Sequence, residues 1–151
     1  MKARLAAILL VATLASLSIA AQSNQVMDSL LAQPQAKCAE TAYMVLICGE
    51  WISESETPAE ALKVAQDKGW ISRSAKDDSP VTLGAFSLLA MKGMRMGGGV
   101  GWTLLPFPYY ALRELSAFGI ANASGGDRRI LSGEEVIRML GKIIASGGGR
   151  Q

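Results

Sequence analysis

"ALKVAQDKGWISRSAKDDSPVTLGAFSLLAMKGM" (residues 61–94) decides the fold, because "ALRELSAFGIANASGGDRRILSGEEVIRMLGKII" (residues 111–144) follows it as a second copy. The two stretches align without a gap at an offset of fifty residues. Self-similarity at a fixed period of this length is typical of repeat architectures. The matched pairs include a glycine, a hydroxyl residue and apolar residues: Gly69 with Gly119, Thr82 with Ser132, Leu62 with Leu112, Phe86 with Val136, and Leu89 with Met139.

Each copy has the pattern of a helix, a polar loop and a second helix. The first helix opens with Ala-Leu and ends at Gly69 or Gly119, where a left-handed backbone costs little. After the loop, Thr82 or Ser132 stands where an N-cap hydroxyl accepts from free backbone amides, and Glu135 adds a capping box to Ser132. Apolar residues three and four positions apart then predict one buried face on each second helix: Phe86, Leu89 and Ala90 in one copy, and Val136, Met139 and Leu140 in the other.

One helix pair cannot bury both of its apolar stripes, so the copies are expected to pack on each other. We therefore predict an all-α fold, a small bundle of two stacked helix-loop-helix repeats. A third, partial unit over residues 26–49 stays open as an alternative, because "CAETAYMVLICG" can stand as a lone second helix that ends at Gly49. Thr57 followed by Pro58 predicts that a helix begins again there.

The first 21 residues have the order of an export signal. Two basic residues within the first four positions precede an uncharged apolar run over residues 5–17, and small residues follow at positions 18, 20 and 21. The run is shorter than the ~20 residues that cross a bilayer, which favours a cleaved signal over an anchor. We expect an exported protein, periplasmic or associated with the cell surface, with its helical domain over residues 22–146, a flexible tail over residues 147–151, and no transmembrane segment after cleavage.

The charge balance argues against a nucleic-acid partner. The chain holds 15 Lys and Arg against 13 Asp and Glu, and two of the basic residues lie in the predicted signal. The mature chain is therefore neutral, and neutrality offers no electrostatic attraction to nucleic acid or to an acidic membrane surface.

The sequence also lacks the usual residues of catalysis. It has no histidine, the commonest general base and metal ligand. Its carboxylate doublets, at residues 77–78 and 134–135, are neighbours in the chain, and adjacent helical residues point about 100° apart, so neither doublet converges on one atom. We expect no catalytic residues, no metal site and no cofactor, and a small hydrolase is the least favoured alternative.

The two cysteines, Cys38 and Cys48, lie within "AKCAETAYMVLICGEW", which is predicted as one helix. Ten helical residues span ~15 Å, whereas the Cα atoms of a disulfide lie within ~7 Å. A bridge within the chain therefore requires a broken helix, and two small core residues are the favoured interpretation. The redox state of the pair stays open at this stage.

The stretch "RMGGGVGWTLLPFPYYALREL" (residues 95–115) lies between the copies and has the most unusual composition. Its glycines fit neither a phosphate loop nor a dinucleotide fingerprint, and they indicate a joint between the units. Aromatic rings with cationic neighbours can stack on sugars or hold a peptide, so this stretch is the candidate binding site. The alternative is that the rings cover the open end of the bundle. The candidate residues are Trp102, Phe107, Tyr109, Tyr110, Arg95 and Arg113.

"AQDKGWISRSAKDDSPVTLGAF" (residues 65–86) and "LSAFGIANASGGDRRILSGEEV" (residues 115–136) resemble the central stretch of the S-layer homology modules of bacterial envelopes. The resemblance implies three units in a helical prism that attaches noncovalently to cell-wall polysaccharide. Binding in that family uses a Thr-Arg-Ala-Glu-like motif. Here Leu83 and Gly133 occupy the arginine position and Ala85 replaces the first acid, so the guanidinium that would grip a carboxylate-bearing glycan is missing from both copies.

These observations lead to one expected function and one alternative. We expect an exported, non-catalytic envelope module that binds wall glycan or another envelope protein. The alternative is a structural accessory subunit of an envelope complex, whose apolar faces are completed by a partner protein.

Overall fold

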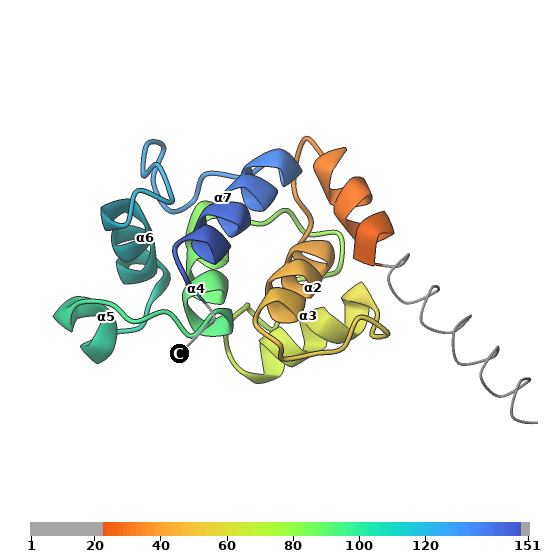
Figure 1. Ribbon diagram of the computed structural model, residues 1–151, viewed down its shortest axis with the longest axis horizontal. Helices are drawn as coiled ribbons and strands as arrows, with labels where there is room; N and C mark the ends of the chain where they lie inside the picture. Colours follow the sequence, from red (N-terminus) through yellow and green to blue (C-terminus); the bar gives the residue numbers. More distant parts are fainter. Residues whose placement is uncertain (1–22, 149–151) are drawn as a thin grey trace, which may run out of the picture.

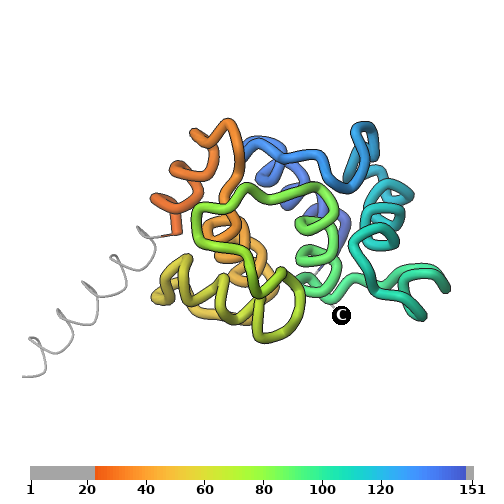
Figure 2. The backbone as a smooth tube through the Cα atoms, turned by 180° about the vertical axis from the view of Figure 1, so that it is seen from behind, coloured from red at the N-terminus to blue at the C-terminus, as the bar shows by residue number. Residues whose placement is uncertain are grey.

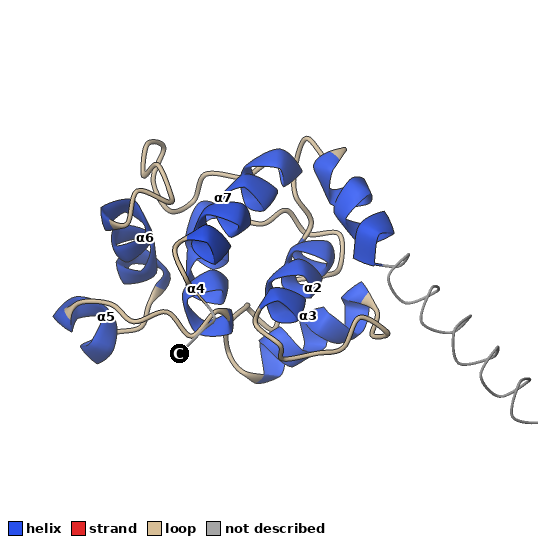
Figure 3. Ribbon diagram, in the orientation of Figure 1, coloured by secondary structure: helices blue, strands red, loops and turns tan. Residues whose placement is uncertain are grey.

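The computed structural model describes residues 23–148, and their helices fall into three pairs (Figure 1). The first pair is a helix over residues 23–31 with α2 (Cys38–Cys48), the second is α3 (Pro58–Asp67) with α4 (Leu83–Gly93), and the third is α6 (Pro108–Ala117) with α7 (Gly133–Ala145). A short helix, α5 (Val100–Leu104), stands between the last two pairs. No strand occurs in the described part of the chain, which confirms the all-α class (Figure 3). The predicted signal lies outside these residues.

Local capping explains where the helices begin. Ser132 accepts a hydrogen bond from the amide of Glu135 at 3.3 Å, and the Glu135 carboxylate accepts from the amide of Ser132 at 3.0 Å. Thr57 and Glu60 form the same reciprocal box at α3. The Thr82 hydroxyl accepts from Ala85 at the start of α4, without a carboxylate in return. The Thr57-x-x-Glu60 spacing is a capping-box signal in the sequence, but it lies just before the aligned repeat, which begins at residue 61.

The first helices of the two copies end in the same way. Gly69 and Gly119 adopt φ of +71° and +70°. The next amide then reaches back over the last turn, from Trp70 to the carbonyl of Ala65 and from Ile120 to that of Leu115, each at 2.9 Å. This bond pattern satisfies carbonyls that a helix end would leave unpaired.

The second helices close with the same pattern, and two of the three place a residue other than glycine in the left-handed conformation. The left-handed residue after α2 is Glu50, one position beyond the predicted Gly49, and the left-handed residue after α4 is Arg95. At α7 the cap uses Gly147 and Gly148, two residues of the predicted tail. Residues 149–151 of that tail lie outside the described part.

The three pairs form a closed ring. Helices α2, α4 and α7 lie around the centre, and the first helix of each pair lies outside them (Figures 1 and 2). Helix α3 packs on α2 and α6 packs on α4, so each first helix covers the second helix of the preceding pair. The 23–31 helix completes the circle at α7, where the amide of Gly133 donates to the carbonyl of Gln33 at 3.0 Å. The third unit that the sequence left open over residues 26–49 is therefore present, and it is a full pair rather than a lone helix, because a packed helix over residues 23–31 precedes α2.

A triangle of backbone hydrogen bonds ties the units together at their centre. Val81 donates to Ala36 at 2.8 Å, Leu131 donates to Val81 at 3.1 Å, and Ala36 donates to Leu131 at 2.8 Å. Each of these residues stands two positions before a second helix. Every unit thus donates to one neighbour and accepts from the other, so the triangle needs all three.

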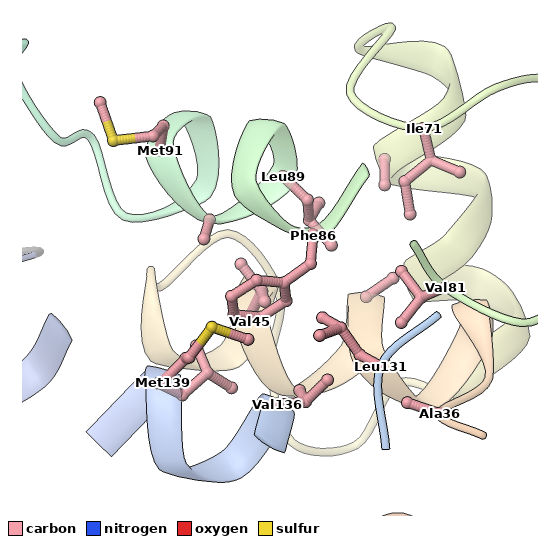
Figure 4. Packing of buried hydrophobic residues seen from close by; sticks show 14 of the residues in the cluster. Ala36, Val45, Ile71, Val81, Phe86, Leu89, Met91, Leu131, Val136 and Met139 are labelled. Carbon is pink, nitrogen blue, oxygen red and sulfur yellow. The ribbon is translucent and has the colours of Figure 1, made fainter. Parts of the chain in front are cut away.

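The core lies between the second helices. Phe86 of α4 points toward Val45 of α2 and Met139 of α7, and all three side chains are buried (Figure 4). Both cysteines are free thiols at opposite ends of an unbroken α2, with Cys38 buried and Cys48 half-buried. The predicted apolar faces of α4 and α7 are the faces that meet here, because they carry the buried residues Phe86, Leu89, Ala90, Val136, Met139 and Leu140.

Candidate functional site

The six predicted binding residues do not form one site. Trp102 is buried, with 7% of its surface exposed, and Lys92 Nζ lies 5.0 Å from its ring centroid. Arg95 makes a different contact: its Nη1 donates to the carbonyl of Gly49 at 2.8 Å, and its guanidinium carbon lies 4.3 Å from the ring centroid of Trp51. Trp102 is buried and Arg95 is held against Trp51, so neither can bind a sugar together with the remaining four residues.

The remaining four residues lie on or beside the chain between α4 and α6. Phe107 and Tyr109 are exposed, Tyr110 is half-buried, and Arg113 is exposed on α6. The rings of Tyr109 and Tyr110 meet edge to face, with centroids 5.4 Å apart. The structure adds three aliphatic residues to this surface that sequence reasoning missed: Val100, Leu104 and Leu105.

Residues 97–109, which we call the arm, carry most of the exposed large apolar side chains of the described chain. Its exposed large side chains are Val100 (76%), Leu104 (72%), Leu105 (45%), Phe107 (59%) and Tyr109 (57%), whereas the other four such residues, Leu31, Phe118, Ile130 and Ile144, are spread over the remainder. No charged residue occurs between Arg95 and Arg113. Exposed apolar side chains gathered on one uncharged segment are typical of docking surfaces.

Close packing within and beside the arm explains two of its glycines, Gly98 and Gly101. A Cβ on Gly98 would lie 2.6 Å from the Trp102 ring, and a Cβ on Gly101 would lie 2.9 Å from the Tyr110 ring. Larger residues would push these rings out of place. The predicted joint is therefore a projecting arm. The rings of Trp102 and Tyr110 pack against its backbone, and its aliphatic side chains are exposed to solvent. It lies at the edge of the molecule, where α5 packs against α6 (Figure 1).

The ring of helices does not need the arm. The equivalent connection from α2 to α3 takes nine residues, 49–57, whereas the connection from α4 to α6 takes fourteen, 94–107. The shorter connection, "GEWISESET", is acidic, and its large apolar residues Trp51 and Ile52 are half-buried. The chain thus connects the first helix pair to the second without an exposed apolar surface. The arm between the second and third pairs is therefore an insertion and not a requirement of the fold.

A second aromatic cluster joins the ends of α2, α3 and α4. Trp51 and Trp70 meet edge to face with centroids 5.1 Å apart, and Lys68 Nζ lies 4.2 Å from the Trp51 centroid. The Trp51 indole donates to the carbonyl of Gly93 at 2.6 Å, while Arg95 reaches back to Gly49. The cations stabilise both the rings and the helix ends. We interpret this cluster as structural.

Two hollows border the third helix pair. A groove of about 350 Å³ lies where α4, α6 and α7 end, and Gly97 at the base of the arm is part of its wall; it is lined by Arg95, Met96, Gly97, Phe118, Ser146, Gly147 and Gly148. We call it the end groove. A smaller hollow of about 100 Å³ contains the ion pair of Arg129 and Glu135, whose nitrogen and oxygen lie 2.7 Å apart.

The Glu135 carboxylate has a structural role in that smaller hollow. A hydrogen bond from the backbone amide of Ser132, followed by the interaction with Arg129, holds its pKa below the ordinary value. Its neighbour Glu134 points to Arg138, with 3.2 Å between nitrogen and oxygen. The doublet therefore diverges, and residues 23–148 contain no group of three His, Cys, Asp or Glu that could hold a metal ion.

No known protein family matches this chain, and neither does any curated protein or solved structure. The resemblance to S-layer homology modules therefore stays a prediction. Among the described helices, none is both long enough and apolar enough to span a membrane.

Proposed function

We propose that this protein is an exported, non-catalytic cell-envelope module that binds another protein through its arm. The observation that carries the proposal is the concentration of exposed apolar side chains on an uncharged insertion. The predicted export signal and the resemblance to envelope modules carry the location. The ring of three helix pairs is the arrangement that this resemblance implies, and it supports a scaffold role.

The size of the patch supports a specific contact. Large side chains present on the order of 150–250 Å² each, so the exposed fractions of Val100, Leu104, Leu105, Phe107 and Tyr109 amount to roughly 500 Å². The largest apolar patch of an ordinary monomer is about 300–600 Å² and is often functional. Removing about 500 Å² from water is worth on the order of 10 kcal/mol before the cost of association is subtracted.

The chemistry of the patch favours a protein over a glycan. The aliphatic side chains of Val100, Leu104 and Leu105 offer no hydrogen bond to sugar hydroxyls. Apolar and aromatic side chains without charges are typical of the centre of a protein interface. Two of the positions that could have held an acidic glycan are unsuited to it, since Arg95 binds Gly49 and Leu83 stands at the motif arginine position; Arg113 is the one candidate cation left exposed.

Crosslinking in native envelopes tests the proposal. A photoreactive amino acid at Leu104 should form an adduct with a defined protein, and the same group at Ile130, exposed but far along the chain from the arm, should not. A second measurement is sedimentation of the purified mature protein with insoluble peptidoglycan. Sedimentation that survives Leu104→Asp would overturn the proposal in favour of glycan binding.

A variant built from the chain's own sequence separates the arm from the fold. Replacing residues 98–107 with "SESET", the sequence of residues 53–57, gives α6 the threonine N-cap that α3 has. We expect this variant to keep its helical circular dichroism, to melt at a lower temperature because the buried Trp102 is removed, and to lose the protein adduct. An adduct that persists without the arm would contradict the proposal.

A further inference from the structure

We infer that the protein partner of the arm is a second copy of this chain, whose end groove receives the arm while its own arm enters the first copy's end groove. This inference rests on the proposed function, because it names the partner of the same surface. It predicts a dimer with a twofold axis near the base of the arm.

The end groove has the size and chemistry to receive aliphatic side chains. Its volume is about 350 Å³, and its apolar walls are Met96, which is half-buried, and Phe118, which is 50% exposed. A dry apolar cavity of about 150 Å³ accommodates a benzene ring. The end groove therefore has room for two branched side chains, and Val100 and Leu104, one turn apart on α5, present such a pair on one side of the helix.

The remainder of the end groove is three glycines, Arg95 and Ser146, whose hydroxyl donates to the carbonyl of Ile143 at 2.8 Å. Gly97, Gly147 and Gly148 have no side chains to obstruct an incoming helix, and Gly147 is held in the left-handed region at φ +84° by the cap of α7. Arg95 is the one charged residue in the wall; its Nη1 donates to the carbonyl of Gly49, and its guanidinium lies against the Trp51 ring. An uncharged arm brings no second cation next to this guanidinium.

The buried area favours a reciprocal contact. The arm alone offers roughly 500 Å², whereas a stable interface buries about 800 Å² on each partner. The arm and the end groove adjoin at Gly97. A twofold axis that brings one arm to the partner's groove brings the second arm to the first groove as well, so each copy buries both surfaces in one continuous interface.

Sedimentation velocity of the purified mature protein, from about 1 to 200 μM, tests the inference. We expect a monomer–dimer equilibrium with no larger species. Leu104→Asp in the arm and Phe118→Asp in the end groove should each raise the dimer Kd at least a hundredfold, while Ile130→Asp, an exposed apolar residue outside both surfaces, should leave it unchanged. Thermal melting of each variant verifies that it is folded.

Mixing the two variants identifies the geometry. The Phe118→Asp copy keeps its arm and the Leu104→Asp copy keeps its end groove, so the mixture should form a heterodimer that neither variant forms alone. Dimerisation of Phe118→Asp by itself would overturn the assignment of the groove, and growth into filaments would overturn the twofold geometry. A monomer at every concentration would overturn the inference, and an adduct of Leu104 with a different envelope protein would then still support the proposed function.

Discussion

Gly133→Ala tests whether the first helix pair closes the ring. A Cβ at this position would lie 1.6 Å from the carbonyl oxygen of Leu30 and 2.5 Å from its carbon, whereas Cβ atoms essentially never come within 3.0 Å of another heavy atom. Both groups are backbone, so the 23–31 helix and α7 must separate by more than about 1 Å. The hydrogen bond from Gly133 to Gln33 is then lost.

The expected cost follows from these contacts. Overpacking costs about 1–3 kcal/mol, the lost hydrogen bond about 1 kcal/mol, and the better helix propensity of alanine returns up to about 1 kcal/mol. We expect the free energy of unfolding to fall by about 2 kcal/mol, which for a domain of this size lowers Tm by roughly 8 °C.

Gly141→Ala is the matched control for this prediction. It lies in the same helix, and a Cβ there meets nothing within 4 Å, so it should stabilise the protein by about 0.5–1 kcal/mol. Urea unfolding followed by circular dichroism measures both variants. If Gly133→Ala proves as stable as the parent protein, the first helix pair does not close the ring as described.

Three further predictions concern single side chains. The hydrogen bond from the N-cap amide lowers the pKa of Glu135, so its carboxylate contributes stability above the ordinary pKa of about 4.3, and this stability is lost as the pH falls through the lowered value. In urea unfolding between about pH 2 and pH 5, Glu135→Gln should therefore make the free energy of unfolding fall less steeply with falling pH. The same pH dependence in the variant and the parent protein would contradict this role of Glu135. Cys38 and Cys48 lie at opposite ends of the same helix, so the native protein should have the intact mass of the reduced chain, without a disulfide. Burial raises the pKa of the Cys38 thiol to about 11, so Cys38 should be alkylated only after the protein is unfolded. Trp102→Ala should cost about 3 kcal/mol of stability because the ring is buried, whereas Tyr109→Ala should change it by less than about 0.5 kcal/mol, and equal melting temperatures would show that Trp102 does not support the arm.

Several features of the fold could be predicted because they depend on residues close together in the chain. Ser132 and Glu135 cap α7 through bonds that span three positions, and Gly69 ends its helix through its own backbone freedom. The buried faces of α4 and α7 follow from apolar residues three and four apart. The first pair was harder to see because its offset from the second is 45 residues rather than 50, measured between Ala36 and Val81, and because Glu50 rather than a glycine ends α2.

By itself, then, the sequence determined the helix class, the repeat and the caps, whereas the tertiary structure alone decided which residues could form a site. Trp102 and Tyr109 have the same aromatic character in the same stretch, yet one is buried under Lys92 and the other faces solvent. Arg95 is drawn to Gly49, 46 residues away, by contacts that no local pattern encodes. The physical reason is that the exposure of a side chain, and the packing of the first helix pair on the third, depend on which helices are in contact. Those contacts join residues such as Leu30 and Gly133, which lie about a hundred positions apart in the chain.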